Sequence, residues 1–212
     1  MKRSRTSKPW WLDRHVHDPY VKRAQQEGYR SRAAYKLLGL DEKDQLLRPG
    51  LTVVDLGAAP GGWCQVAAKK VGAKGRVIGI DLLDMAPVPG VEFIRGDFAD
   101  VEGRALVESR LQGHKADLVL SDMAPNLSGV QGVDQARHYV LAELALEFAA
   151  HCLKPDGAFV VKVFQGSGFE DYLRRVKAYF HRTVIRKPDA SRNESRENFL
   201  VARGLAKSSA PA

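Results

Sequence analysis

The chain has 212 residues, of which 44% are hydrophobic, and its formal net charge is +8. It is long enough for one well-buried domain, and no apolar run has the length of a membrane span or of a secretion signal, so we expect a cytoplasmic protein without a membrane partner. Cys64 and Cys152 are its two cysteines, which excludes a disulfide framework, and no His or Cys grouping has zinc-ligand spacing, so no metal is expected.

Most of the excess positive charge lies near the N-terminus. Residues 1–36 contain ten Lys or Arg but only three acidic side chains, and five Trp or Tyr lie among them. Cations neutralise phosphates, and aromatic rings stack on unpaired bases. We therefore predict a basic tail over residues 1–17, followed by helices that contact RNA. For the first residues, the alternatives are a solvated tail or an organellar transit peptide.

Two helices are expected directly after this tail. Asp18 is a suitable N-cap, Pro19 suits the first helical position, and Gly28 closes the helix. A second helix is predicted to start after Ser31 and to end before Pro49.

Predicted strands and helices alternate along the rest of the chain. Strands are expected near 52–56, 76–80, 91–94, 117–121 and 157–164, and helices near 61–71, 101–111, 134–153 and 168–180. This order predicts an α/β fold with a doubly wound parallel sheet. Only a loop separates the runs 183–186 and 198–203, so this last pair should be antiparallel. We expect one domain over 18–204 and a disordered tail over 205–212.

A glycine-rich turn follows the first predicted strand in the segment LTVVDLGAAPGGWC, residues 51–64. Gly57, Gly61 and Gly62 let the backbone turn tightly and approach a ligand. The spacing differs from the G-x-G-x-x-G of dinucleotide-binding folds, and Trp63 and Cys64 replace the Lys-Ser or Lys-Thr pair of a phosphate-binding loop. The Asp-x-Gly turn resembles the S-adenosylmethionine loop of Rossmann-like methyltransferases. The alternative is an ordinary strand-to-helix turn.

Aspartates follow three further predicted strands. Asp81 lies about twenty residues beyond the glycine loop, where a carboxylate can bind a ribose diol. Asp97 is placed to receive an adenine amino group, with Phe98 beside the ring. Asp122 is the second residue of SDMAPN, a segment in which amino-group methyltransferases carry an aromatic residue that stacks on a flipped base. No aromatic residue is present here, so a hydroxyl acceptor fits better. Each aspartate has the alternative role of capping a turn or helix.

Lys162 lies within the apolar run AFVVKVF. Burial of an ammonium group is costly unless the group is paired or deprotonated. A ribose 2′-hydroxyl is a poor nucleophile, and a lysine that loses its proton through desolvation and a nearby second cation can act as its base. The alternative is a lysine that extends to solvent from an edge strand.

Together these segments resemble the FtsJ-like family, the bacterial ribose 2′-O-methyltransferases of large-subunit ribosomal RNA. The resemblance covers nearly the whole chain and rests on SRAAYKL (31–37), DLGAAPGGW (55–63), SDMAPN (121–126), VKVFQG (161–166) and SRNESRE (191–197). It implies a Rossmann-like class I fold with a seven-stranded sheet, S-adenosylmethionine as cofactor, and a uridine in the A-loop of 23S ribosomal RNA, within the large ribosomal subunit, as substrate.

The resemblance also implies site residues. The family's catalytic tetrad falls on Lys36, Asp122, Lys162 and Glu197, and its S-adenosylmethionine contacts fall on Gly61, Trp63, Asp81, Asp97 and Asp122. With the loop residues Gly57 and Gly62 and with Phe98, these are the expected cofactor-binding residues. The expected RNA-binding residues are Lys22, Arg23, Arg32, Tyr35, Arg192 and Arg196.

In the expected mechanism, Lys162 takes the hydroxyl proton during an in-line displacement. Lys36 stabilises the developing oxyanion, Asp122 orients the two lysines, and Glu197 is a supporting partner. Two other functions remain open: an RNA-binding ribosome-assembly factor that keeps S-adenosylmethionine only structurally, and a 2′-O-methyltransferase for transfer RNA or an mRNA cap. A monomer is the default expectation.

Overall fold

The computed structural model describes residues 18–126, 128–192 and 194–206; the predicted tails over 1–17 and 207–212 lie outside them. Seven strands form one sheet in the order β3-β2-β1-β4-β5-β7-β6. The strands are β1 (Thr52–Leu56), β2 (Arg76–Asp81), β3 (Val91–Arg95), β4 (Ala116–Ser121), β5 (Leu153–Phe164), β6 (Phe180–Arg186) and β7 (Glu197–Leu205). β7 is antiparallel to both of its neighbours, and the other pairs are parallel. The predicted mostly parallel sheet with one antiparallel strand is confirmed.

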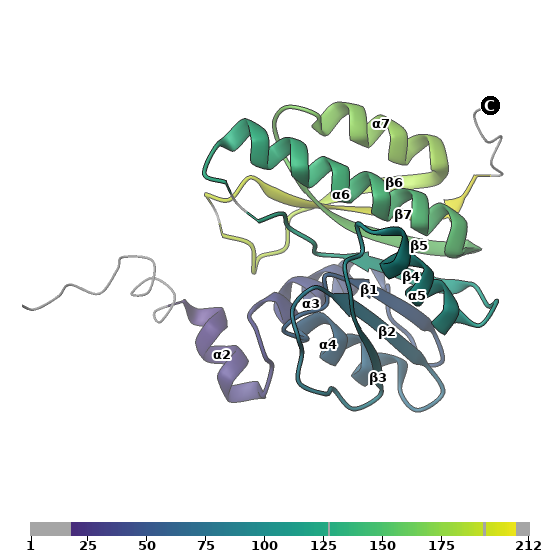
Figure 1. The fold of residues 1–212 in the computed structure, drawn as a ribbon. Helices are drawn as coiled ribbons and strands as arrows, with labels where there is room; N and C mark the ends of the chain where they lie inside the picture. The colour runs from purple at the N-terminus through teal and green to yellow at the C-terminus, as the bar shows by residue number, and fades with distance from the viewer. Residues whose placement is uncertain (1–17, 127, 193, 207–212) are drawn as a thin grey trace, which may run out of the picture.

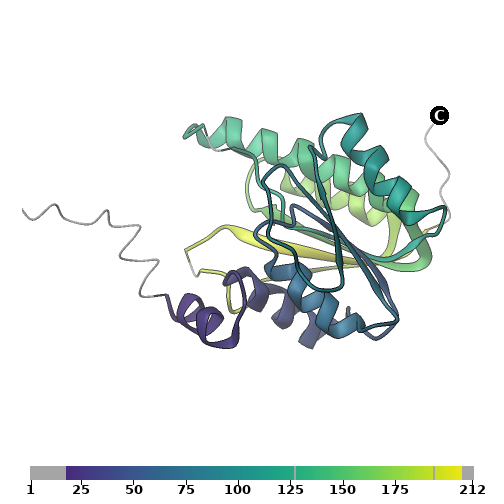
Figure 2. The ribbon, with the colours of Figure 1, turned by 60° about the horizontal axis from the view of Figure 1, so that its bottom comes forward.

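Helices cover both faces of this sheet, as a doubly wound fold requires (Figure 1). They are α2 (Pro19–Glu27), α3 (Ala33–Asp44), α4 (Gly62–Val71), α5 (Val101–Leu111), α6 (Gln131–Cys152) and α7 (Phe169–Tyr179). Figure 2 shows α3 and α4 on one side of the sheet and α5, α6 and α7 on the other. Neighbouring strand residues point to opposite faces, so Val53 packs in the core under α3 and α4 whereas Val54 packs in the core under α5, α6 and α7.

The predicted first helix is confirmed as α2. The Asp18 side chain accepts a hydrogen bond from the Tyr20 N–H, and Gly28 ends the helix with φ of 74°. The second helix, α3, is shorter than predicted, because Gln45 takes a left-handed conformation and its N–H bonds to the Asp41 carbonyl.

Four further boundaries differ from the predictions: α6 starts at Gln131 instead of near 134, β6 starts at Phe180 instead of 183, and β5 and β7 differ as follows. β5 starts at Leu153, directly after α6, instead of near residue 157; Leu153 pairs with Ala116, and the register then shifts before the next pair. β7 includes Leu205, and the Ala206 N–H donates to the Tyr179 carbonyl. The predicted disordered tail therefore starts too early, because these residues bond to the neighbouring strand segment.

The topology brings the ends of several elements to one edge of the sheet. The parallel strands β1, β2, β4 and β5 all finish there, where open α/β sheets bind ligands. Because β7 runs the other way, it begins at this edge, and Glu197 pairs with Phe164 at the end of β5. Among the described residues, no helix is long and apolar enough to cross a bilayer, and no cluster of three His, Cys, Asp or Glu side chains could hold a metal ion.

Candidate active site

A buried lysine and an aspartate form the centre of the site. Lys162 Nζ lies 3.0 Å from Asp122 Oδ1 and donates a hydrogen bond of 2.6 Å to the Asp122 carbonyl. The Lys162 side chain is 7% exposed and the Asp122 side chain 18% exposed. The predicted burial of Lys162 is therefore compensated by two acceptors of one residue, which places its amine at the end of β4.

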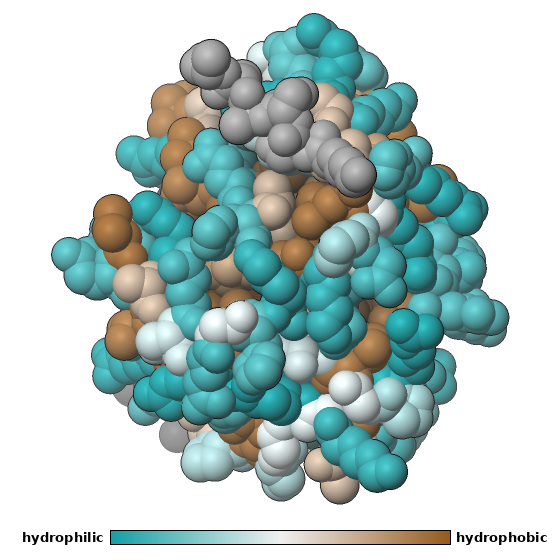
Figure 3. All heavy atoms as spheres, turned by 90° about the vertical axis from the view of Figure 1, so that its right-hand side faces the viewer, coloured by the Kyte–Doolittle hydropathy of each residue, from teal (hydrophilic) through white to brown (hydrophobic). Residues whose placement is uncertain are grey.

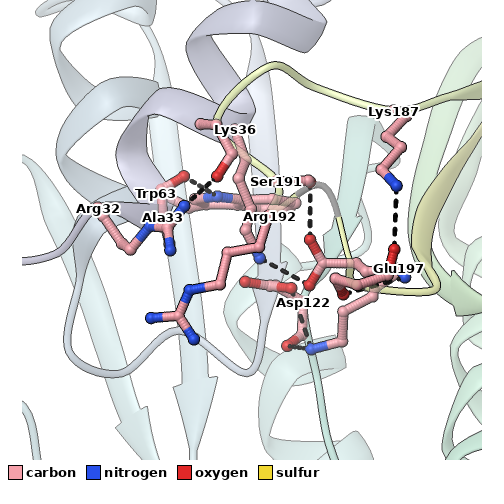
Figure 4. Close-up of polar contacts among 12 residues, drawn as sticks. Arg32, Ala33, Lys36, Trp63, Asp122, Lys187, Ser191, Arg192 and Glu197 are labelled. Carbon is pink, nitrogen blue, oxygen red and sulfur yellow. Dashed lines mark hydrogen bonds and ion pairs between the residues drawn. The ribbon is translucent and has the colours of Figure 1, made fainter. Parts of the chain in front are cut away.

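A second ion pair connects α3 with the start of β7. Lys36 Nζ lies 2.7 Å from Glu197 Oε2, and Glu197 Oε1 accepts a hydrogen bond of 2.9 Å from Ser191 Oγ (Figure 4). Lys36 and Glu197 are 161 positions apart in the chain. Both carboxylate oxygens are thus held, so the position of the Lys36 amine depends on the segment before β7.

The two ion pairs meet at one cavity. This basic cavity has a volume of about 400 Å³, and Asp122, Lys36 and Glu197 all line it. Arg32 and Arg192 also line it and are tied to the same acidic residue: Arg32 lies 2.6 Å from Asp18, and Arg192 lies 3.8 Å from it. Figure 4 shows Arg32, Lys36 and Arg192 on one side of Asp122. The structure therefore brings the predicted tetrad together and surrounds it with guanidinium groups.

Three glycines of the turn after β1 pack closely against neighbouring segments of the chain. Gly57 has φ of 83°, and a Cβ there would lie 2.9 Å from Met123 Cγ. Gly61 has φ of 105°, and a Cβ there would lie 2.8 Å from the sulfur of Met85. At Gly62 a Cβ would meet Ser31 Oγ at 2.5 Å. Lack of space explains why glycine stands at all three positions, and the left-handed backbone is a second reason at Gly57 and Gly61.

Two of the predicted aspartates hold backbone N–H groups and keep further acceptor capacity. Asp81 accepts 2.9 Å from the Ala59 N–H of the glycine-rich turn and 2.8 Å from the Leu83 N–H. Asp97 accepts 2.8 Å from the Ala99 N–H. An ionised carboxylate has about four lone-pair sites, so both side chains can bind further donors, such as the hydroxyls of a ribose.

Asp55, which the sequence analysis did not single out, is a fully buried carboxyl group directly before the glycine-rich turn. Its Oδ2 accepts 3.2 Å from Cys64 Sγ, and its Oδ1 has no partner. Burial raises the pKa of Asp55 to about 7; the Cys64 contact opposes this, whereas the charges of Asp122 and Asp81 add to it. The two carboxylates that follow β2 and β4, Asp81 and Asp122, suit a positively charged ligand, such as the sulfonium of S-adenosylmethionine.

Two aromatic rings that were expected beside the cofactor belong to the hydrophobic cores. Trp63 is 3% exposed, its indole N–H donates to the Ala33 carbonyl, and its ring lies 5.6 Å from that of Phe199. Phe98 is 4% exposed and packs edge to face against Phe148. Phe98 was expected beside an adenine ring; in the structure its ring packs against Phe148 within the core under α5, α6 and α7.

The expected RNA-binding residues fall into two groups. Lys22 and Arg23 on α2 and Arg192 and Arg196 before β7 are exposed. Tyr35 is buried instead, since its ring packs against two tyrosines and beneath the guanidinium of Arg23, at 4.6 Å. The expectation that Tyr35 offers a face to an RNA base is wrong, because these neighbours already cover the ring.

Two more residues near the site were not recognised from the sequence. Arg30 donates to the carbonyls of Pro60, Ala86 and Pro87, and so ties the glycine-rich turn to the segment after β2. His138 on α6 is buried, and its Nε2 lies 3.0 Å from the carbonyl of Lys162. Burial and the nearby Lys162 charge lower the pKa of His138 to about 4, so its ring is neutral at pH 7 and donates to that carbonyl.

Comparisons with known proteins point to one family. The model of the FtsJ-like methyltransferase family matches residues 29–205. The chain is 62% identical over 193 residues to a Thiobacillus denitrificans protein named ribosomal RNA large subunit methyltransferase E, covering 91% of this chain and 88% of that protein. A Marinobacter nauticus protein of the same name is 56% identical over 205 residues and covers 97% and 99%. A Plasmodium falciparum crystal structure, described as a predicted ribosomal RNA methyltransferase, superposes with a TM-score of 0.75 at 31% identity, covering 84% of this chain and 98% of that one.

Proposed function

Because the chain belongs to the FtsJ-like methyltransferase family, we propose that it transfers a methyl group from S-adenosylmethionine to a ribose 2′-hydroxyl of large-subunit ribosomal RNA. The observation that carries this proposal is the buried amine of Lys162, which Asp122 holds at the strand edge beside the glycine-rich turn and the basic cavity. Such an amine has the chemistry of a base for a hydroxyl group.

The residues at the ends of β1, β2 and β4 are those that would hold the cofactor. The glycine-rich turn lies at this edge of the sheet, and Asp81, which accepts a hydrogen bond from the Ala59 N–H of the turn, keeps acceptor sites for a ribose diol. Trp63 would contact the cofactor through its backbone N–H in the first turn of α4, because its indole ring is buried. When bound, S-adenosylmethionine supplies a methyl group on a positively charged sulfur that a ribose oxygen can attack.

Lys162 acts as the general base in this proposal. In its neutral form, Lys162 accepts the proton of the 2′-hydroxyl, becomes an ammonium, and so makes the oxygen a better nucleophile. Asp122 holds the amine with its carboxylate and its carbonyl, which fixes the direction from which the hydroxyl must approach. Positioning of the reacting groups supplies a further share of the rate.

Lys36 stabilises the negative charge that develops on the oxygen, because its amine lines the same cavity as Asp122. Glu197 is a positioning residue, since it holds Lys36 at 2.7 Å and is itself held by Ser191. The absence of an aromatic residue in 122–124 supports a hydroxyl over a base amine as acceptor.

The curated relatives carry the name of a large-subunit ribosomal RNA methyltransferase, and we propose the same RNA class for this chain. Following the family resemblance, the acceptor is a uridine in the A-loop of 23S ribosomal RNA, within the large subunit. The basic residues Arg32 and Arg192 support a polyanionic partner. We further propose that the enzyme acts as a cytoplasmic monomer.

A methyl-transfer assay with three RNA substrates tests this proposal. Labelled S-adenosylmethionine is supplied with free large-subunit RNA, intact large subunits or transfer RNA, and the modified position is mapped. We expect one ribose-methylated uridine in the large-subunit RNA. Modification of transfer RNA alone would contradict the proposed substrate, and RNA binding without transfer to any of the three would support an assembly factor instead.

A further inference from the structure

A second cavity lies beside the catalytic residues, on the side of α6. It has a volume of about 560 Å³ and is lined by the loop after β4, the start of α6, the end of β5 and the segment before β7. Its lining includes Ala124 and Pro125, which follow Asp122, and Arg196, which precedes Glu197. We call it the α6 cavity.

Lys162 contacts a lining residue of the α6 cavity and a lining residue of the basic cavity. Its ammonium contacts Asp122, which lines the basic cavity, and its carbonyl lies 3.0 Å from the His138 ring, which lines the α6 cavity. A ribose whose hydroxyl reaches Lys162 therefore lies near both cavities.

The two cavities differ in chemistry. The basic cavity carries Arg32, Lys36 and Arg192, which suit a phosphate. The α6 cavity is lined by apolar groups that include the half-buried ring of Phe164, by the exposed residues Gln131 and Gln165, and by one carboxylate and one guanidinium, those of Asp134 and Arg196. Apolar and aromatic walls with a few amides are what a protein uses to hold an unpaired base and to bond its edge.

We propose that the α6 cavity binds the base of the acceptor nucleotide, while the basic cavity binds its phosphate. This inference rests on the proposed function, because it places a nucleotide whose ribose is methylated. It fixes the orientation of the nucleotide: the base lies between α6 and the end of β5, and the strand continues past α3 and the segment before β7. The base must leave its stack to enter, so the preferred substrate is an unpaired nucleotide.

A bulky substitution in the α6 cavity tests this placement. Ala124 is exposed, so Ala124→Trp fills the cavity without disturbing the core. Ala73→Trp, in an exposed turn that lines neither cavity, is the matched control. Transfer is measured on the mapped RNA and on the same RNA with an abasic ribose at the acceptor position.

We expect the effects of the protein substitution and of base removal from the RNA on kcat/KM to be non-additive. Removal of the base should lower kcat/KM of the wild type and of Ala73→Trp about tenfold or more, because one base contact is lost. Ala124→Trp should already be reduced on the complete RNA and should lose little more on the abasic RNA. Equal losses in wild type and Ala124→Trp would overturn the placement, whereas no transfer by the wild type to either RNA would overturn the proposed function.

Photocrosslinking gives an independent readout that needs no transfer. RNA with 4-thiouridine at the acceptor position is irradiated with the wild-type protein, and the crosslinked peptide is identified. We expect attachment within 124–138 or 164–165. Attachment within 31–36 or 190–192 would place the base in the basic cavity and overturn the proposal.

Discussion

The part of the site proposed to bind the methyl donor and the part proposed to bind the acceptor RNA have opposite charge. We call them the donor side and the acceptor side. Asp81 and Asp122 stand at the ends of β2 and β4, whereas Lys36 lies in α3, Arg32 directly precedes α3, and Arg192 lies in the segment before β7. A sulfonium cofactor and a polyanionic RNA need opposite surroundings. In the proposed function, the acidic side therefore binds the cofactor, the basic side binds the RNA, and Lys162, which contacts Asp122, lies where the two sides meet.

The largest effect on activity is expected from removal of the proposed general base, Lys162, which lies between the two sides. Lys162→Met should lower the single-turnover rate by about a hundredfold or more, because the hydroxyl then keeps its proton, while the Kd of S-adenosylmethionine stays unchanged. Lys154→Met is a control on the same strand, since Lys154 pairs with Asp117 away from the site. A wild-type rate in Lys162→Met would contradict its role as base.

A change on the donor side should affect the cofactor alone. Asp81→Asn should raise the Kd of S-adenosylmethionine about tenfold or more, because a charged acceptor for the ribose is lost, and should leave the Kd of RNA unchanged. Calorimetry of both ligands measures this. Asp84→Asn, three positions further in the same exposed loop, should bind normally. If Asp81→Asn weakened RNA binding as much as cofactor binding, the proposal that the two ligands bind on separate sides would be contradicted.

A change on the acceptor side should affect RNA alone. Arg192→Gln should weaken RNA binding several-fold and reduce the slope of log K against log salt by about one, since one phosphate contact is lost. Arg174→Gln, on the exposed face of α7, is the control. Titrations at several salt concentrations measure the slope, and an unchanged slope would show that Arg192 contacts no phosphate.

The smallest effect on activity is expected from substitution of the buried Asp55, which should instead alter how stability depends on pH. The pKa of Asp55 is raised to about 7, so the folded state holds a proton that the unfolded chain releases above about pH 4. The free energy of unfolding should therefore fall as pH rises from about 4 to about 7, by up to about 1.4 kcal/mol per pH unit.

Asp55→Asn should lack this contribution while other titrating groups remain. Urea unfolding of wild type and variant at pH 5 and pH 7 measures it. The wild type should lose more stability than the variant over this interval. Identical changes in the two proteins would mean that the Asp55 carboxyl does not hold the proton.

The two sides also differ in how far the sequence predicted them. The donor side follows from local pattern, because the glycine-rich turn and Asp81 directly follow strands whose ends must meet in a parallel sheet. The role of Arg30 was not predictable in this way, because it depends on three carbonyls of two distant loops. The raised pKa of Asp55 was not predictable from the motif in which it lies, because it results from complete burial of the carboxyl group.

The acceptor side depends on contacts between distant parts of the chain. The Lys36–Glu197 pair spans 161 positions, and only the family resemblance identified both residues. Burial of Tyr35 was missed because α2 and Tyr29 cover it from segments whose packing no local pattern specifies. The face of the molecule shown in Figure 3 is mostly hydrophilic, with scattered apolar residues.

The chemical position of the transferred methyl group tests the central claim most directly. Large-subunit RNA is incubated with the wild-type enzyme and labelled S-adenosylmethionine, digested to nucleosides, and separated by chromatography with mass detection. The arrangement of Lys162 between a carboxylate-lined donor side and an arginine-lined acceptor side predicts that the label is found in a 2′-O-methylated nucleoside. Label on a base, with an unmodified ribose, would contradict the account.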